Sequence, residues 1–237
     1  LPTFTFTSTA ESVAFLGAKP FFVDISINSF NINFTDLEHG INSIKNKKII
    51  KAIILVDLFG QPANIDKANE ISKKYNIPII IDEAQSFGAI YKNKNVGAMG
   101  LITTTSFFPT KPLCGFGDGG AIFTNKKNIY KKIISLRNHG AGKNKYKNIA
   151  IGLNSRLDSI QSSMLLEKFK FFKKELKIRT NIAKFYSKYL KNVTHVPFID
   201  NDIKSAWAQY TIILNSVKKR NDYYIILNKN LIDTKIY

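Results

Sequence analysis

The feature that most constrains this chain is its alternation of short apolar runs with segments of helical periodicity. Apolar runs rich in β-branched residues occupy positions 51–59 and 77–82, and a helical segment at 65–75 lies between them. Strands that are apolar along their whole length are typical of a parallel sheet buried on both faces. The pattern therefore predicts an α/β fold, with a mostly parallel sheet and helices on both of its faces.

Helix-capping residues and apolar runs predict the positions of the other helices and strands. Thr35 and Glu38 fit a capping box at the start of a short helix, and Asn64 is expected to cap the helix at 65–75. Further strands are predicted at 20–25, 101–108, 120–124 and 207–214, and further helices at 127–139 and 158–191.

The pattern changes near residue 156, where the alternation gives way to one long helical stretch. We therefore predict a large domain over 1–155, a connecting helical segment over 156–195 and the start of a smaller C-terminal α/β domain over 196–237. Both ends of the sequence resemble mid-domain sequence, so we expect a fragment in which the large domain lacks its N-terminal part and the small domain is truncated.

Composition excludes several classes of protein. The formal net charge is +18, but the lysines are scattered and accompany many Asn and Ile residues, which favours solvated lysines over a nucleic-acid surface. The longest apolar runs are too short to span a membrane. The single cysteine, Cys114, excludes an intrachain disulfide and a multi-cysteine metal site, so we expect a reducing, cytoplasmic location and no metal.

The segment 106–120, SFFPTKPLCGFGDGG, contains one lysine followed by a run of glycines. Gly115, Gly117 and Gly120 satisfy the spacing of a dinucleotide-binding motif. That motif requires a helix N-terminus after the glycines, whereas the next residues, AIFT, predict a strand. We therefore expect these glycines to allow tight turning and close backbone approach beside the lysine.

Polar side chains come at the ends of two predicted strands. Asp82 ends the run at 77–82, and Ser106 lies near the end of the next strand, with Lys111 in the loop beyond. Taken alone, Asp82 fits a helix cap or a structural ion pair, Ser106 fits a loop or strand-end hydroxyl, and Lys111 fits a surface lysine. Together they can supply a Schiff-base amine, a carboxylate for a pyridine nitrogen and a hydroxyl for a phosphate, which are the parts of a pyridoxal-phosphate site. Ligands of parallel α/β sheets bind at this edge.

At this point the chain resembles the DegT/StrS family of sugar aminotransferases, which have the fold-type-I, aspartate aminotransferase-like architecture. The similar segments follow the order of the family along nearly the whole chain. They are PTFTFTSTA (2–10), GAKPFFVDI (17–25), AIILVDLFGQPANID (52–66), IIIDEAQSFGA (79–89), SFFPTKPLCGFGDGGAIFTN (106–125), LRNHG (136–140), GLNSRLDSIQSSML (152–165) and SAWAQYTI (205–212).

The resemblance implies pyridoxal 5′-phosphate as cofactor and assigns a role to each matching residue. Lys111 matches the lysine that binds the cofactor covalently and later transfers a proton. Asp82 matches the carboxylate that keeps the ring nitrogen protonated, and Ser106 matches a phosphate ligand. Desolvation beside a cationic ring would keep part of the Lys111 amine neutral.

The remaining matches surround the ring. Gln85 matches the residue near the 3-hydroxyl, Phe6 matches the aromatic on one ring face, and Ala84 matches the small residue under the other. Asn154 matches a phosphate ligand from the partner subunit, which implies a homodimer. Without the resemblance, core packing for Phe6 and a loop turn for Asn154 are the favoured interpretations.

The family implies transfer of an amino group, expected from glutamate, to a nucleotide-linked keto sugar. The motif variants are most similar to members that aminate the 3-position for surface polysaccharides. A non-catalytic regulatory relative and a cofactor-dependent sugar dehydratase are the alternatives. Lys111 argues against the dehydratase, because relatives with that activity carry a histidine at this position.

Overall fold

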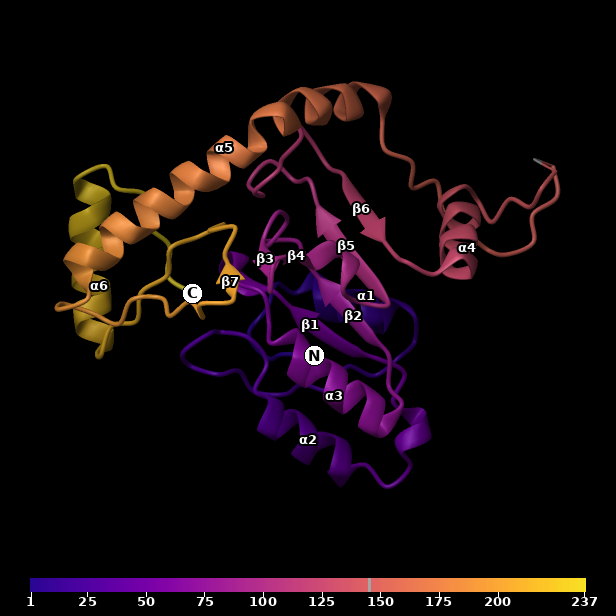
Figure 1. The fold of residues 1–237 in the computed structure, drawn as a ribbon, viewed down its shortest axis with the longest axis horizontal. Helices are drawn as coiled ribbons and strands as arrows, with labels where there is room; N and C mark the ends of the chain where they lie inside the picture. Colours follow the sequence, from indigo (N-terminus) through magenta and orange to yellow (C-terminus); the bar gives the residue numbers. More distant parts are fainter. Residues whose placement is uncertain (145) are drawn as a thin grey trace.

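A four-stranded sheet forms the centre of the molecule. The computed structural model describes residues 1–144 and 146–237 (Figure 1). The strand order is β1-β2-β5-β6; β1, β2 and β5 are parallel, and β6 runs antiparallel to β5. The prediction of a mostly parallel sheet is therefore confirmed. The strands are β1 (Ile53–Val56), β2 (Ile79–Asp82), β5 (Ile102–Ser106) and β6 (Gly120–Phe123).

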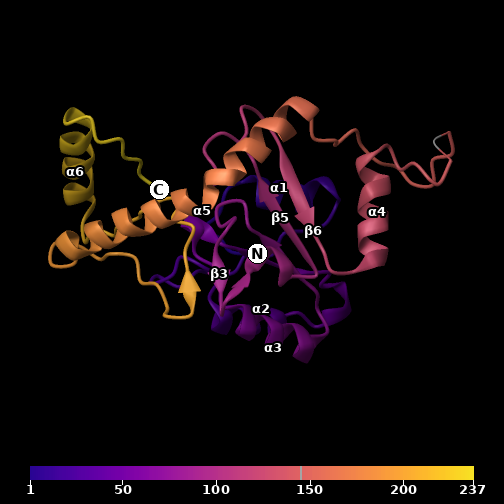
Figure 2. The same cartoon turned by 45° about the horizontal axis from the view of Figure 1, so that its top comes forward.

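Helices enclose the sheet. In Figures 1 and 2 the sheet lies between α3 (Ile65–Tyr75) and α2 (Phe34–Ser43) at the bottom and α5 (Ser159–Leu190) at the top. The helix α3 spans the predicted residues, and Asn64 caps it by accepting a 3.0 Å hydrogen bond from the Lys67 amide. The prediction of this helix and its cap is confirmed.

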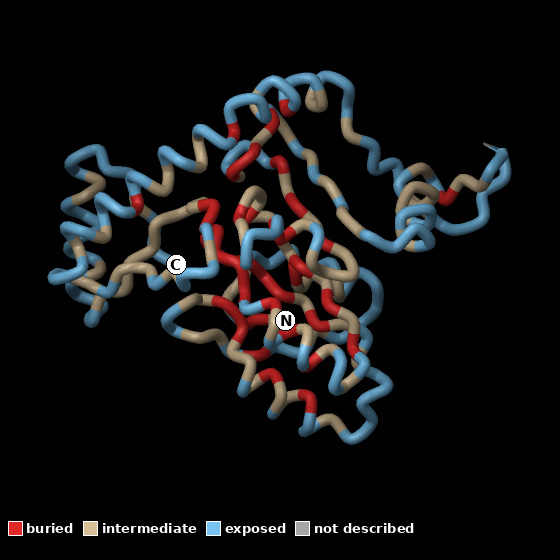
Figure 3. Tube along the Cα trace, viewed as in Figure 1, coloured by how far each residue is buried: buried red, intermediate tan, exposed pale blue. Residues whose placement is uncertain are grey.

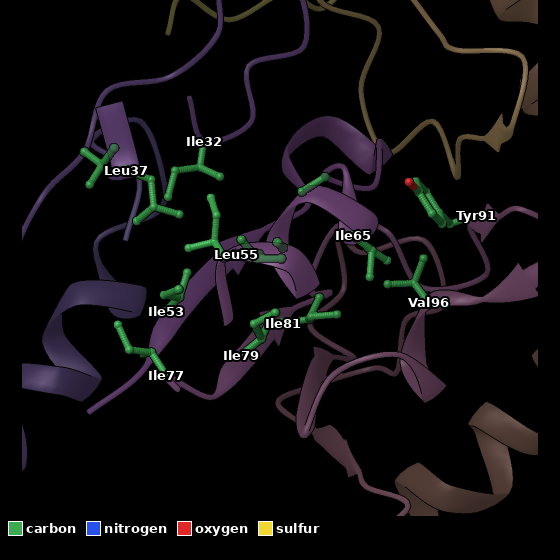
Figure 4. Packing of buried hydrophobic residues seen from close by; sticks show 14 of the residues in the cluster. Ile32, Leu37, Ile53, Leu55, Ile65, Ile77, Ile79, Ile81, Tyr91 and Val96 are labelled. Carbon is green, nitrogen blue, oxygen red and sulfur yellow. The ribbon is translucent and has the colours of Figure 1, made fainter. Parts of the chain in front are cut away.

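The main core lies between the sheet and α3. Figure 4 shows Ile53, Leu55, Ile65 and Ile81 in this cluster, and Leu55 and Ile81 are fully buried. Burial of each such side chain contributes about 1.5–3 kcal/mol relative to exposure. Figure 3 shows the buried residues concentrated around the sheet, whereas α4 (Lys127–Arg137) and α6 (Val217–Lys229) are mainly exposed or intermediate. The sheet, whose strands carry the polar ends, is thus the most buried part of the molecule.

A second cluster attaches α5 to the loop that follows β5. Phe107 and Leu113 from this loop pack with Leu165 and Phe172 of α5, and all four side chains are buried. The loop therefore has apolar anchors on both sides of Lys111, which limits where the lysine side chain can reach.

Gly88 marks a close contact between α5 and the chain after β2. Its φ is +88°, and a Cβ atom there would lie 2.6 Å from Phe172 Cε1 and 2.7 Å from Leu176 Cδ1. We expect Gly88→Ala to lower the free energy of unfolding by about 2–4 kcal/mol, because it adds overpacking to backbone strain. Urea unfolding measures this loss.

Gly17→Ala is the matched control for this substitution. Gly17 also has a positive φ, +71°, but a Cβ atom there meets nothing within 4 Å. Its expected loss is therefore about 1–2 kcal/mol, from backbone strain alone. Equal losses in the two variants would contradict the close packing of α5 on Gly88.

The remaining elements connect or extend this core. A second, three-stranded antiparallel sheet has the order β4-β3-β7. Its strands are β3 (Ile90–Tyr91), β4 (Lys94–Asn95) and β7 (Ile203–Lys204); α1 spans Ser8–Phe15, and 3₁₀ helices span Lys47–Ile49, Leu58–Gly60 and Val96–Ala98.

Two predicted strands are wrong. In the segment 20–25 only isolated bridges form, Pro2 with Val23 and Ile25 with Ile32, because successive residues pair with different partners. In the segment 207–214 Trp207 has φ +50°, which interrupts an extended chain at its start. Only Ile213 pairs there, with His195.

The predicted capping box at Thr35 is also wrong. The helix α2 starts at Phe34, and its cap is Asn33, two residues before Thr35; Asn33 accepts hydrogen bonds from the amides of Thr35 and Asp36. Glu38 instead forms a 2.8 Å ion pair with Lys74 of α3. An asparagine outside the expected motif was the stronger cap here.

Candidate active site

Asp82 lies at the carboxyl end of β2, and two hydrogen bonds fix its carboxylate. Its Oδ2 atom accepts a 2.8 Å bond from the Thr9 hydroxyl, and its Oδ1 atom accepts a 3.1 Å bond from the Ala84 amide. Thr9 comes from α1, so this contact joins segments 73 residues apart. Each carboxylate oxygen keeps acceptor capacity for one further donor.

Lys111 lies beyond the end of the neighbouring strand β5, and its side chain interacts electrostatically with Asp82. Burial lowers the pKa of the Lys111 ammonium, and the negative charge of Asp82 opposes part of that shift. Lys111 Nζ is 6.0 Å from the centroid of the Phe6 ring. The amine, the acid and an aromatic ring are therefore on the same side of the sheet.

Ser106 and Phe6 each present an unused binding feature. Ser106 Oγ accepts a 3.2 Å bond from the Phe108 amide, which leaves the hydroxyl proton available to another acceptor. Phe6 is 69% exposed beside Lys111, so a flat aromatic surface faces open space. Ala84 follows the turn after Asp82 and is half-buried.

Gln85 and Asn154 are held by other parts of the chain. Gln85 Oε1 accepts a 2.6 Å hydrogen bond from the amide of Phe59. Asn154 is exposed and pairs with Asn138 in an isolated bridge, in the segment between α4 and α5. The structure thus brings Asp82, Lys111 and Phe6 together and gives Asn154 a different set of neighbours within its own chain.

Sequence reasoning missed two buried acids behind Asp82. Asp57 follows β1 and accepts bonds from the Ser86 hydroxyl at 2.8 Å and the Ala63 amide at 2.9 Å. Burial raises its pKa to about 7. Glu83 is 2% exposed, and burial together with the charge of Asp57 raises its pKa to about 8. Asp57 has the same signal as Asp82, a carboxylate directly after an apolar strand.

The glycine run is followed by a strand, as expected. The strand β6 begins at Gly120, so the helix required by a dinucleotide motif is absent here. Close approach is confirmed, because a Cβ atom at Gly120 would lie 2.6 Å from the Thr105 carbonyl oxygen. The chain also bends at 111–113 and at 116–117, although Gly115, Gly117 and Gly120 have no positive φ.

The described residues contain neither a metal-binding cluster nor a membrane-spanning helix. In residues 1–144 and 146–237, no three His, Cys, Asp or Glu side chains gather as they would around a metal ion. In the same part of the chain, each helix is too short or too polar to cross a bilayer.

The residues present fit a flat heterocycle that carries an aldehyde and a phosphate. The site offers a half-buried amine of lowered pKa, an oriented carboxylate with spare acceptor capacity, an exposed aromatic face and an available hydroxyl. These groups can respectively attack a carbonyl, hold a ring N–H, stack on a ring and donate to a phosphate oxygen. Pyridoxal 5′-phosphate has all four complementary features.

Comparison with curated proteins gives two close relatives. UDP-2-acetamido-2-deoxy-3-oxo-D-glucuronate aminotransferase of Pseudomonas aeruginosa is 44% identical over 216 residues, which cover 91% of this chain and 58% of that protein. A protein of Geobacillus stearothermophilus named pleiotropic regulatory protein is 37% identical over 238 residues, which cover 99% of this chain and 62% of that protein.

Comparison with solved structures confirms the fold. A DegT DnrJ EryC1 StrS aminotransferase from Brucella abortus superimposes with a TM-score of 0.95 at 42% identity, covering 100% of this chain and 63% of that one. The chain thus spans between 58% and 63% of the length of these three proteins. The model of one family matches residues 1–237. The chain belongs to the DegT/DnrJ/EryC1/StrS aminotransferase family.

Proposed function

We propose that this chain is the cofactor-binding part of a pyridoxal-phosphate-dependent aminotransferase, which moves an amino group from an amino acid to a nucleotide-linked keto sugar. The observation that carries the proposal is the half-buried Lys111 amine beside the oriented Asp82 carboxylate and the exposed Phe6 ring. The relative of Pseudomonas aeruginosa has a name that describes this reaction class.

When bound, the cofactor supplies an electron-withdrawing ring that stabilises negative charge on the carbon next to the reacting nitrogen. Asp82 keeps the ring nitrogen protonated, and Thr9 and the Ala84 amide hold the carboxylate for this task. Lys111 would hold the cofactor covalently, and its freed amine would take and return the proton on that carbon. Its lowered pKa favours both tasks, because each needs a neutral amine.

The other candidate residues would bind the cofactor and orient its ring. Ser106 donates its hydroxyl proton to the phosphate, Phe6 stacks on one ring face, and Ala84 leaves room at the other. Asn154, which is exposed between α4 and α5, would act in the site of a partner subunit. We accordingly propose a homodimer with shared sites.

The name of one relative indicates a class of substrate. A 3-keto sugar linked to a nucleotide, for example to UDP, is the proposed acceptor, because the name of the 44% identical relative specifies a 3-oxo sugar. Glutamate is the proposed donor, and surface glycans made from cytoplasmic precursors are the proposed destination of the product.

A second candidate function is regulation without catalysis. It is favoured by the name of the relative from Geobacillus stearothermophilus, pleiotropic regulatory protein. The presence of Lys111, Asp82 and Ser106 together favours catalysis, since a regulator has no need of an amine with a lowered pKa.

The test is product analysis by mass spectrometry. The protein is incubated with pyridoxal phosphate, glutamate and a UDP- or dTDP-linked 3-keto sugar, and a reaction without glutamate is the control. An amino sugar that forms only with glutamate supports the proposal. Release of ammonia with a deoxygenated sugar identifies a dehydratase, and cofactor binding without any product identifies a regulator; either result overturns it.

A further inference from the structure

Thr9, in the first turn of α1, contacts the candidate site through both its backbone and its side chain. Its amide donates a 3.1 Å hydrogen bond to the carbonyl oxygen of Phe6. Its hydroxyl donates the 2.8 Å hydrogen bond to Asp82 Oδ2. Thr9 is 6% exposed, so water has little access to these bonds. One buried residue thus links the segment that carries the aromatic ring to the carboxylate at the end of β2.

A second hydroxyl lies behind the first. Thr5 Oγ1 is 3.2 Å from Thr9 Oγ1, at hydrogen-bond distance, and Thr5 is half-buried. A threonine hydroxyl has one proton to donate, and an ionised carboxylate can only accept. The Thr9 proton therefore goes to Asp82, and Thr5 must be the donor to Thr9. Both protons point along one chain toward the carboxylate.

Packing and hydrogen bonds outside the pair hold the two threonines in place. The ring of Phe4, the neighbour of Thr5, packs edge-on against Phe59 with a centroid distance of 6.0 Å. Ser12 Oγ donates a 3.0 Å hydrogen bond to the Thr9 carbonyl oxygen. The alignment of the two hydroxyls is therefore supported by contacts that do not depend on their own hydrogen bond.

The direction of these protons has a chemical consequence. A hydrogen bond that is donated to a carboxylate favours its charged form. Asp82 receives two such bonds, from the Thr9 hydroxyl and from the Ala84 amide. Thr5 strengthens the first bond, because a hydroxyl that accepts a hydrogen bond becomes a better donor. A carboxylate stabilised in this way competes less for a proton that it shares with another base.

We propose that Thr5 and Thr9 are positioning residues, a hydroxyl relay that keeps the proton shared by Asp82 and the cofactor on the ring nitrogen. This inference rests on the proposed function, in which Asp82 binds that nitrogen. The Thr9 amide has a further role, because its bond to the Phe6 carbonyl oxygen ties the segment of the stacking ring to the same residue. Neither threonine has to touch the cofactor for these effects.

The test is ¹⁵N NMR of the protein loaded with pyridoxal 5′-phosphate that is labelled at the ring nitrogen. Thr9→Val keeps the shape and the backbone bond but removes the donor. The proton partition should change about tenfold toward Asp82, because a hydrogen bond to a charged group contributes at least that factor. The nitrogen resonance should therefore move toward its unprotonated position. Thr5→Val should move it less in the same direction, and Thr9→Ser, which retains the hydroxyl, should keep the wild-type resonance.

Thr7→Val is the matched control. Thr7 lies between the two positions and is exposed, and within the described residues its side chain makes no capping bond to α1. This variant should keep the wild-type resonance. If Thr9→Val does not fold, Thr5→Val decides.

Two kinds of result would contradict the inference. A wild-type resonance in the deciding valine variant, or an equal shift in Thr7→Val, overturns the relay alone. A wild-type protein that binds no cofactor overturns the proposed function and the relay with it, and an unprotonated ring nitrogen in the loaded wild type overturns the role of Asp82 on which the relay depends.

Discussion

Lys111→Ala is expected to lower aminotransferase turnover by about 10³-fold or more and to abolish covalent attachment of the cofactor. The reason is that one side chain performs two tasks, the covalent bond and the proton transfer, and general acid–base catalysis alone contributes about 10²–10⁴-fold. Asp82, Phe6 and Ser106 stay in place, so non-covalent binding of the cofactor should persist with reduced affinity.

Borohydride reduction followed by peptide mass spectrometry locates the covalent bond. In the wild type the adduct should map to the peptide that contains Lys111, and in Lys111→Ala it should be absent. Lys168→Ala is the matched control, because Lys168 contacts the same loop, with Nζ 2.8 Å from Cys114 Sγ. It should retain the adduct and the turnover. An adduct that survives in Lys111→Ala would contradict the assignment.

The parts of the fold that sequence predicted well are those fixed by local rules. The apolar runs at 53–56 and 79–82 gave the parallel strands, and Asn64 gave the start of α3. The same reasoning placed Asp82 and Lys111 at one edge, because neighbouring parallel strands end together. Their electrostatic interaction agrees with that placement.

The parts that could not be predicted depend on contacts between distant segments. Nothing near Thr9 indicates that its hydroxyl binds Asp82, 73 residues away. Phe59 and Trp207 have left-handed backbone conformations, although neither is a glycine or an asparagine. Both lie where Gly60, next to Phe59, packs against the backbone of 206–208. This contact lies at the start of the apolar run at 207–214, where Trp207 interrupts the extended chain.

Glu83→Gln is expected to stabilise the protein at pH 8 by about 2–4 kcal/mol while changing little at pH 5. Burial and the charge of Asp57 raise the pKa of Glu83 to about 8. A backbone contact with Gly97 opposes part of this shift. Its Oε2 atom has no hydrogen-bond partner among the described residues. A neutral amide of the same shape avoids the cost of ionising this group in the core.

The direction of the pH dependence follows from proton linkage. Between about pH 4.5 and pH 8 the folded protein keeps a proton on Glu83 that the unfolded chain has released, so the free energy of unfolding falls as pH rises through this window. Asp57, with a pKa raised to about 7, adds to the same slope. Urea unfolding at pH 5, 6, 7 and 8 should therefore show a shallower fall in Glu83→Gln than in the wild type.

Glu70→Gln is the matched control, because it removes an equal charge from an exposed position on α3. If it flattened the pH dependence as much as Glu83→Gln, net charge would be the cause and not the buried carboxyl. Both buried acids lie close to the candidate site. Glu83 follows Asp82 in the chain, and Asp57 interacts electrostatically with Asp82. A proton kept on this pair at neutral pH limits the negative charge behind Asp82, at the edge of the sheet where the cofactor is proposed to bind.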